Sequence, residues 1–469
     1  MNNVLQTLRG KNIHLIGITG AEGSALLRFL LSNGIDTIVA HDFLAGNSLE
    51  KSYKLYHKGV ESRERDRHFK QFLEDVSRVK LRLDTDYLCD VRSADAIFVP
   101  QSWRLYRQNT PLWEVKKGGV PFYSLTRMYL DFAPAKMIAV TGTVGKGSVA
   151  NLIYQILKKS QKPVHLAGND TWMMQNVDKL FHLGKEDILV LEISHRQLLD
   201  GFTKAPPFIV ITNIYPNHLD EVSWEEYKNL KFSLPKLQGS EGIAILNFDF
   251  PELRELGNEL KSKVLYFSSK SQDKNTKNVQ KIYDTIMSNK FDHYPENILA
   301  AGSVVEQFGV TSEQMQGILP TIPKPPARME YLRTISGIDI FDDLKSTTPW
   351  ATLAGLHYLL PRYKKMYLIC GGETKGISYI SFCEEMKKIP IEVVILASEL
   401  AHVLQSNLPK SQLHKSSTLE DAFRVANGRA KSGECIVVSP AAAFFYRDFI
   451  AGKKSIRKLA TSLLPKAQE

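Results

Sequence analysis

Short apolar runs alternate with amphipathic stretches along most of this chain, and turns rich in glycine or small polar residues separate them. Residues 12–42 predict a strand, a glycine turn, a helix and a second strand. Further strand-like runs are ADAIFVP (94–100), GGVPFYSL (118–125), DILVLEIS (187–194) and FIVITNIYPNHLD (208–220). Strands that alternate with helices predict an α/β fold.

A dense run of charges interrupts this pattern at residues 49–90. Its apolar positions recur at helical spacing: Phe69, Phe72, Leu73, Val76 and Val79. We therefore expect a helix that packs through these positions and exposes its charges to solvent.

The length of 469 residues is too great for one ordinary core and predicts three domains. The proline-rich segment TIPKPPAR (321–328) predicts a hinge, because prolines break helices between two patterned regions. We expect a Rossmann-like domain over 1–125, a P-loop-type ATPase domain over 126–325 and a second Rossmann-like domain over 326–469.

The stretch MIAVTGTVGKGSVANLIY (137–154) reads as a strand, a glycine-rich loop and a helix. Gly142, Gly145 and Gly147 let consecutive backbone N–H groups face one anion, and Lys146 reaches the outer phosphates. The loop departs from GxxxxGK[ST], and an ordinary glycine-rich turn is the competing interpretation. The stretch predicts a site for a nucleoside triphosphate.

A weaker nucleotide signal lies near the start of the chain. Gly17, Gly20 and Gly23 are spaced GxxGxxG, and Asp42 closes the second strand, where dinucleotide folds carry an acidic residue. A Rossmann-like nucleotide site and plain turn geometry both remain open here.

Two polar side chains follow neighbouring apolar runs. Glu192 is near the carboxyl end of one predicted strand, and His218 follows the next. Because open α/β sheets bind ligands at this edge, both side chains could hold magnesium between protein and phosphate.

The composition of the chain indicates which binding partners and which cellular compartment to expect. The net charge of +10 is spread thinly, so small polyanions are expected rather than nucleic acid. The four cysteines form no CxxC pair, which agrees with a reducing compartment. No apolar run approaches the roughly 18 residues of a membrane span, and the start lacks a signal-peptide core. We therefore expect a cytoplasmic protein without membrane contact.

Three motifs, TGTVGKGS, LEISHRQLL and NIYPNHLD, resemble those of the Mur ligase family in their order and spacing. Members of this family join amino acids to the peptide of the cell-wall precursor. SWEEYKNLK (223–231) is similar to the family segment whose lysine carries a carbamate, which implies a carbamylated Lys231 able to hold a second magnesium ion. Other similar segments are YPENILAAGSVVEQFGV, PARMEYL, FDDLKSTTPWA, LICGGETKG and CIVVSPAAA.

This resemblance implies an ATP-dependent amide ligase of peptidoglycan synthesis. It would add D-glutamate to UDP-N-acetylmuramoyl-L-alanine through an acyl phosphate, releasing ADP and phosphate, with ATP and two Mg²⁺ ions. The implied catalytic residues are Lys146, Glu192, His218, Lys231 and Lys345. The implied metal ligands are Ser148, Glu192, His218 and Lys231. The implied ATP contacts are Gly142, Thr143, Gly145, Lys146, Gly147, Ser148, Asn297, Arg328 and Asp343. The implied substrate contacts are Gly17, Thr19, Asp42, Asn169, Ser194, Gln197, Thr347, Lys375 and Ser439.

The chain departs from the family pattern at several positions. Gly147 replaces the serine or threonine that follows the loop lysine, so Ser148 substitutes or the first metal is held differently. Phe444 stands where the family has a serine for the carboxylate of the incoming amino acid. Pro100, Gln101 and Ser102 replace an S-P-G turn.

Two alternatives therefore stay open. One is a related ligase for a different amino acid or acceptor, of the folylpolyglutamate or poly-glutamate type. The other is a nucleotide-binding protein without catalysis. We expect a monomer in each case.

Overall fold

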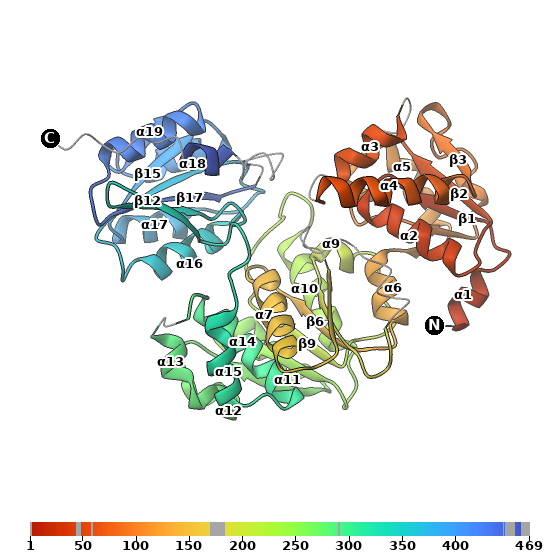
Figure 1. Ribbon diagram of the computed structural model, residues 1–469, viewed down its shortest axis with the longest axis horizontal. Helices are drawn as coiled ribbons and strands as arrows, with labels where there is room; N and C mark the ends of the chain where they lie inside the picture. Colours follow the sequence, from red (N-terminus) through yellow and green to blue (C-terminus); the bar gives the residue numbers. More distant parts are fainter. Residues whose placement is uncertain are drawn as a thin grey trace.

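Three separate sheets organise the chain, and each carries helices on its faces (Figure 1). The computed structural model describes residues 2–43, 48–57, 60–168, 183–288, 291–443, 445 and 455–460. The predicted α/β fold is confirmed. Among the described strands, only β12 and β13 pair in antiparallel fashion, and every other pairing within the three sheets is parallel.

The first sheet has the strand order β3-β2-β1-β4-β5. Its strands are β1 Ile13–Ile16, β2 Ile38–Asp42, β3 Lys80–Leu83, β4 Ala96–Phe98 and β5 Phe122–Tyr123. Its helices are α1 Asn2–Leu8, α2 Ala21–Ser32, α3 Leu49–Tyr56, α4 Ser62–Val76, α5 Thr110–Lys117 and α6 Leu125–Phe132. The order reverses between β1 and β4, which is the position where open α/β sheets bind ligands at their carboxyl edge. The predicted Rossmann-like arrangement is confirmed.

The charged stretch forms α3, α4 and β3 and belongs to this first unit. Phe69, Phe72 and Val76 of α4 are buried as predicted, but the prediction for Leu73 is wrong, because its exposed fraction is 43%. At 100° per residue, Leu73 lies at the edge of the stripe that the other three define.

The central sheet has the order β11-β10-β9-β6-β8-β7 and is parallel throughout. Its strands are β6 Lys136–Thr141, β7 Val164–Gly168, β8 Ile188–Glu192, β9 Phe208–Ile211, β10 Ile243–Asn247 and β11 Lys263–Phe267. Its helices are α7 Lys146–Lys159, α9 His195–Leu198, α10 Trp224–Lys236, α11 Pro251–Glu259, α12 Lys277–Lys281, α13 Tyr283–Met287, α14 Pro295–Val305 and α15 Ser312–Ile318. Helices cover both faces, which is why β8 and β9 read as continuous apolar runs.

The third sheet has the order β12-β13-β17-β14-β15-β16. Its strands are β12 Glu330–Ile335, β13 Ile338–Asp342, β14 Met366–Gly371, β15 Ile391–Leu396, β16 Leu413–Ser416 and β17 Cys435–Ala441. Its helices are α16 Pro349–Leu359, α17 Ile380–Lys388, α18 Glu399–Asn407 and α19 Leu419–Arg429. The last of the described strands, β17, thus lies in the middle of the sheet, between β13 and β14.

The proline-rich segment connects the central and third sheets without forming a strand or α-helix. Lys324 in this segment pairs with Asp292 of the central unit at 2.8 Å, and its ammonium lies 4.3 Å from the ring centre of Tyr358 in α16. Tyr358 in turn donates a 3.0 Å hydrogen bond to Asp292. One lysine therefore holds the linker against both units.

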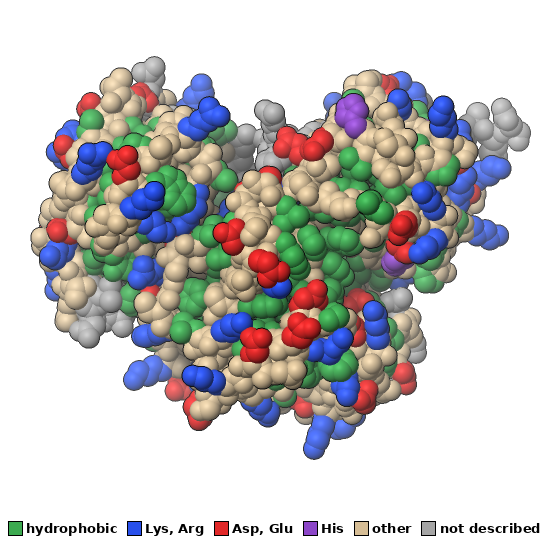
Figure 2. All heavy atoms as spheres, turned by 180° about the vertical axis from the view of Figure 1, so that it is seen from behind, with side chains coloured by type: hydrophobic (Ala, Val, Ile, Leu, Met, Phe, Trp, Pro, Cys, Tyr) green, Lys and Arg blue, Asp and Glu red, His purple; other side chains and the backbone are tan. Residues whose placement is uncertain are grey.

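The outer surface mixes charges of both signs. On the face shown in Figure 2, lysines and arginines are interspersed with aspartates and glutamates and form no single stripe. Within the described ranges, no helix combines the length and the apolar character that crossing a membrane requires.

Candidate active site

The glycine-rich loop connects β6 to α7 at the carboxyl edge of the central sheet, as the sequence predicts. Gly145 caps α7 with φ of 84°, a left-handed conformation that favours glycine. Lys146 is the first residue of the helix, and its Nζ donates a 3.0 Å hydrogen bond to the carbonyl of Thr143. The positive end of a 14-residue helix and a lysine thus meet at one loop, which is the geometry of a phosphate site.

Two residues after β9 brace this loop. Asn213 Oδ1 accepts hydrogen bonds from the backbone N–H groups of Thr143 (3.2 Å) and Val144 (2.8 Å). The Asn213 amide and the Thr212 hydroxyl both donate to the Val144 carbonyl, at 2.9 and 2.7 Å. Asn213 was not among the predicted site residues, although it begins the NIYPNHLD motif. Its position in that motif, directly after a buried strand, is the signal that could have identified it.

Asn297 of α14 lies against the loop. A Cβ atom added to Gly145 would be 2.6 Å from Asn297 Oδ1. The structure therefore brings together two of the predicted ATP contacts, Gly145 within the loop and Asn297 beside it.

This contact gives a testable prediction for Gly145→Ala. The alanine is strained by its left-handed φ and also displaces Asn297, so ADP should bind several-fold to about tenfold more weakly, as the loss of one hydrogen bond predicts. Gly119→Ala is the matched control, since Gly119 has φ of 88° and nothing within 4 Å of the added Cβ. Calorimetric titration with ADP checks both variants, and equal ADP affinity in the two would contradict the prediction.

A buried lysine lies behind the loop. Lys231 of α10 is 1% exposed, and its Nζ is 3.5 Å from Thr141 Oγ1 at the end of β6. Burial and the nearby Lys146 hold the pKa of Lys231 well below its usual range, and Glu192 offsets part of this effect. Lys146 begins α7 directly after the loop, Glu192 ends β8 beside β6, and Lys231 contacts the last residue of β6, so all three lie at the carboxyl edge of the central sheet. Ser148 is buried on the first turn of α7.

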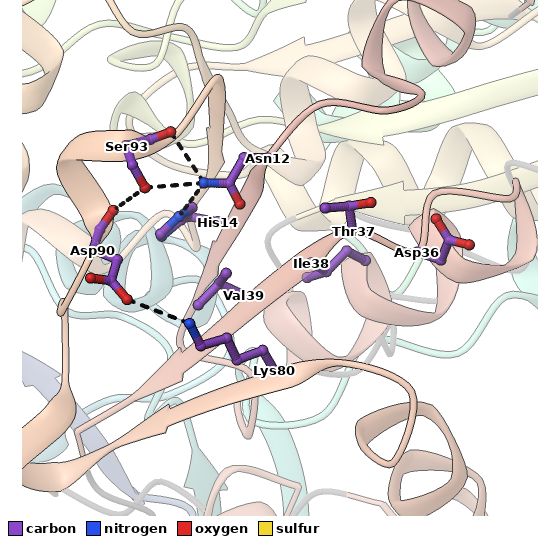
Figure 3. Close-up of a pocket in the computed structure, with 9 residues that line it drawn as sticks. All are labelled: Asn12, His14, Asp36, Thr37, Ile38, Val39, Lys80, Asp90 and Ser93. Atoms are coloured by element: carbon purple, nitrogen blue, oxygen red, sulfur yellow. Dashed lines mark hydrogen bonds and ion pairs between the residues drawn. The ribbon is translucent and has the colours of Figure 1, made fainter.

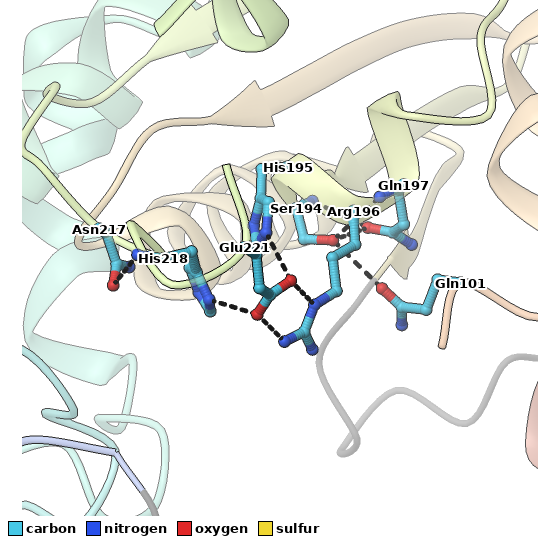
Figure 4. Close-up of polar contacts among 8 residues, drawn as sticks. All are labelled: Gln101, Ser194, His195, Arg196, Gln197, Asn217, His218 and Glu221. Atoms are coloured by element: carbon cyan, nitrogen blue, oxygen red, sulfur yellow. Dashed lines mark hydrogen bonds and ion pairs between the residues drawn. The ribbon is translucent and has the colours of Figure 1, made fainter. Parts of the chain in front are cut away.

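His218 lies in a neighbouring group of side chains (Figure 4). Its Nδ1 is 3.1 Å from Glu221 Oε1, and its ring centre is 4.1 Å from that of His195. Arg196 donates to both carboxylate oxygens of Glu221. Among the described residues, His195, His218 and Glu221 are the histidine and acidic side chains close enough to share one metal ion. The sequence predicted His218 in this group and missed the other members.

The electrostatics of this group keep the histidines neutral and the glutamate charged. Burial lowers the pKa of His218 to about 4 and that of His195 to about 3. Burial alone would raise the pKa of Glu221, but the nearby His195 ring and hydrogen bonds with His218 and Arg196 bring it far below its usual range. Neutral imidazoles are the form that binds a metal.

A loop of the third unit reaches the central unit at this point. Lys375 follows β14 with φ of 55°, and the next residue, Gly376, approaches Leu219 and Asp220. Burial and, to a smaller extent, the nearby Arg196 lower the pKa of Lys375 to about 8, although Asp220 and Glu221 offset part of this effect. A second contact is the Trp350 ring of α16, which stacks on Tyr215 with centres 4.9 Å apart.

The other predicted residues of the third unit lie near its first two strands. Asp343 and Ser439 are buried and bonded to each other, with Ser439 Oγ 2.8 Å from Asp343 Oδ2. Burial raises the pKa of Asp343 to about 6. Arg328 donates a long 3.5 Å bond to the carbonyl of Lys345, and Thr347 is half-buried nearby. Roles for these residues at ATP or the amino acid stay predictions.

In the first unit, the predicted substrate contacts Thr19 and Asp42 touch each other. Thr19 donates to Asp42 Oδ2 through both its N–H (3.0 Å) and its hydroxyl (2.6 Å). Gly17 precedes them at the end of β1, with φ of 69°. The glycine turn at Gly17 and the acidic residue Asp42 therefore lie at the carboxyl edge of the sheet, where the strand order reverses between β1 and β4.

The first and central units meet beside α9. Ser194 caps this helix together with Gln197, and its hydroxyl donates a 3.2 Å bond to Gln101 of the first unit. Arg104 pairs with Asp200 at 2.7 Å in the same junction. The predicted residue Asn169 and the departure at Phe444 lie outside the described residues.

A cavity of about 530 Å³ lies at the opposite, amino edge of the first sheet (Figure 3). Asn12, His14, Thr37, Lys80 and Asp90 are among its lining residues. Because open parallel sheets bind their ligands at the carboxyl edge, this cavity does not belong to the candidate site.

Comparison with known proteins agrees with this geometry. The Mur ligase middle domain model matches residues 140–303. The chain is 30% identical over 394 residues to the UDP-N-acetylmuramoylalanine--D-glutamate ligase of Clostridium botulinum strain Langeland, covering 80% of this chain and 83% of that protein. A protein of the same name from Acetivibrio thermocellus is 27% identical over an alignment of 491 residues, covering 99% of each.

Solved structures share the fold. The MurF ligase from Thermotoga maritima in complex with ADP superposes with a TM-score of 0.57 at 17% identity, covering 98% of this chain and all of that one. The UDP-N-acetylmuramate-alanine ligase MurC from the same organism gives 0.56 at 15% identity, covering 96% and 99%. With its phosphate loop, its three sheets and this similarity over most of its length, the chain belongs to the Mur ligase family.

Proposed function

We propose that this protein joins D-glutamate to UDP-N-acetylmuramoyl-L-alanine at the expense of ATP, releasing ADP and phosphate. The observation that carries the proposal is the position of Lys146, Lys231 and Glu192 at the carboxyl edge of neighbouring strands of the central sheet. The names of the relatives in Clostridium botulinum and Acetivibrio thermocellus support this choice of substrates.

The reaction proceeds in two displacements. An oxygen of the alanine carboxylate attacks the γ-phosphorus of ATP, and ADP leaves, which gives an acyl phosphate. The amino group of D-glutamate then attacks the carbonyl carbon, loses a proton, and expels phosphate to form the amide. Phosphoryl transfer depends mainly on positioning and charge neutralisation, which Lys146 and the start of α7 supply.

The central site fits two magnesium ions once Lys231 carries a carbamate. An unmodified Lys231 offers a divalent cation no oxygen ligand, whereas a carbamate on Lys231 and the Glu192 carboxylate together offer the oxygen ligands that Mg²⁺ prefers. The lowered pKa of Lys231 favours the neutral amine, which adds to CO₂ through its lone pair and releases one proton. Ser148 and His218 complete the proposed ligands, and the bound ions would neutralise phosphate charge.

The remaining contacts come from the outer units. We assign the UDP-sugar to residues 1–125, where Gly17, Thr19 and Asp42 gather, and ATP to residues 126–325. The unit of residues 326–469 supplies Arg328, Lys345 and Lys375 to the reacting groups, and it closes on the central unit about the proline-rich segment. The protein acts as a monomer in this scheme.

The test is phosphate release from ATP with UDP-N-acetylmuramoyl-L-alanine and a panel of amino acids. D-Glutamate should stimulate release, and L-glutamate, D-aspartate and glycine should not. Stimulation by a different amino acid would contradict the assignment of D-glutamate but retain the ligase chemistry. No release with any amino acid would contradict the ligase itself.

Lys375 gives a prediction for the pH dependence of this reaction. Its pKa of about 8 means that the side chain is charged below that pH and neutral above it. If its ammonium binds a carboxylate of D-glutamate, kcat/KM for D-glutamate should fall as the pH rises through about 8, because charge-assisted hydrogen bonds are the stronger ones.

The control is Lys375→Arg, which stays charged throughout this range. The ratio of the two kcat/KM values cancels the ionisation of the substrate amine, which is common to both enzymes. A ratio that does not change between pH 7 and pH 9.5 would exclude Lys375 from carboxylate binding.

A further inference from the structure

Glu221 contacts His218, the residue to which we assign a role at magnesium. Both belong to the loop that follows β9, three residues apart, and His218 Nδ1 is 3.1 Å from Glu221 Oε1 (Figure 4). The loop holds His218 in a left-handed conformation with φ of 56°, and the backbone N–H of His218 donates a 3.0 Å bond to Asn217 Oδ1. The imidazole is therefore fixed both by its backbone and through one ring nitrogen.

The protonation pattern of this ring follows from its partner. Arg196 donates to both oxygens of Glu221, one of these bonds being 2.8 Å, so the carboxylate is paired with a cation and acts only as an acceptor. An acceptor at Nδ1 requires the proton of the neutral imidazole to lie on Nδ1. Nε2 then keeps its lone pair.

The neighbouring residues His195 and Arg196 limit how a cation could bind at this group of side chains. The ring of His195 lies 4.1 Å from that of His218, between centres, and is 4% exposed. A cation bound directly among His195, His218 and Glu221 would face the guanidinium of Arg196, which already occupies the carboxylate. Glu221 is thus suited to act on a metal through His218, not as a ligand itself.

We propose that Glu221 is a positioning residue, which fixes His218 in the Nδ1–H form and leaves Nε2 free to bind the divalent cation. The proposal rests on the proposed function, because it takes His218 as a metal ligand. Partners of this kind behind metal-binding histidines orient the ring, and their loss typically weakens metal binding 10- to 100-fold.

The experiment compares four variants with the wild type. Glu221→Leu removes the acceptor at similar size, and Glu221→Ser removes it with a side chain suited to solvent. Arg196→Met breaks the ion pair but leaves the Glu221 carboxylate beside His218. His218→Gln removes the ring. Two quantities are measured: the dissociation constant for Mn²⁺ in the presence of ADP, from the electron paramagnetic resonance of free Mn²⁺, and the ¹⁵N shifts of the His218 ring in metal-free protein.

We expect both Glu221 variants to bind Mn²⁺ at least tenfold more weakly, as such partners generally do, and to show the Nε2–H form of His218. The Mn²⁺ dissociation constant of Arg196→Met should stay within about threefold of the wild-type value, and its His218 ring should keep the Nδ1–H form, because Glu221, the direct partner of the ring, is retained. The inference would be overturned if both Glu221 variants lost less than tenfold in Mn²⁺ affinity, or if their His218 ring kept the Nδ1–H form. An equal loss of Mn²⁺ affinity in Arg196→Met would also overturn it. Unchanged Mn²⁺ affinity in His218→Gln would instead overturn the proposed metal role of His218, and the ring shifts separate these two results.

Discussion

Replacing Lys146 with alanine is expected to reduce ATP-dependent phosphate release at least about a hundredfold, since removing one preorganised charge typically costs 10² or more. The lysine lies at the first position of α7 beside the glycine-rich loop, and its Nζ donates a hydrogen bond to the Thr143 carbonyl in that loop. We therefore expect Lys146 to contribute charge at the proposed phosphate site and little packing. Thermal unfolding of the variant should match that of the wild type.

Lys159→Ala is the control for this prediction. Lys159 ends the same helix and is exposed to solvent, so its loss changes the total charge equally without touching the loop. Phosphate release by this control should stay close to the wild-type rate. A Lys146→Ala enzyme that keeps more than roughly a tenth of the activity would show that the loop does not hold the transferred phosphate.

Lys231→Ala should be nearly inactive and should recover in part when bicarbonate and a short carboxylic acid are added. The truncated side chain leaves space beside Thr141 and Glu192 at a position that is 1% exposed, and a small carboxylate can take the place of the proposed carbamate there. Lys231→Arg should stay inactive under the same conditions. A guanidinium keeps its positive charge and fills the space with a cation.

Lys228→Ala controls for the loss of a lysine from the same helix. Lys228 precedes Lys231 by one turn and pairs with the exposed Glu225 at 2.9 Å. Its replacement should leave phosphate release unchanged. Equal activity of the wild type and Lys231→Arg would contradict both the proposed carbamate and the magnesium ion that it is proposed to hold.

The phosphate loop was predictable because its signal is local. Glycines, a lysine and an apolar strand stand next to each other in the sequence, and the helix begins at the predicted lysine. The position of Glu192 at the end of β8 was predictable for the same reason. The alternation of strands and helices likewise determined the fold class.

Contacts between distant segments were not predictable in this way. Lys231 reads as an ordinary helical lysine, and only the family resemblance singled it out, because its burial depends on how α10 packs against the end of β6. Glu221 and Arg196 form their ion pair across 25 positions of sequence. Asp343 and Ser439 are 96 positions apart and form a buried hydrogen bond with each other inside the third unit. The hydrophobic periodicity of the sequence contains no signal for such pairs.

The strand order of the third sheet has a consequence for how the chain is made. β17 Cys435–Ala441 lies between β13 and β14, so until it leaves the ribosome the third sheet consists of two parts with open edges. The first sheet, in contrast, is complete once residue 123 has been added. Synthesis therefore delivers the first and central units before the third can fold. A premature stop ahead of residue 435 leaves an incomplete third sheet that is prone to pairing with other chains.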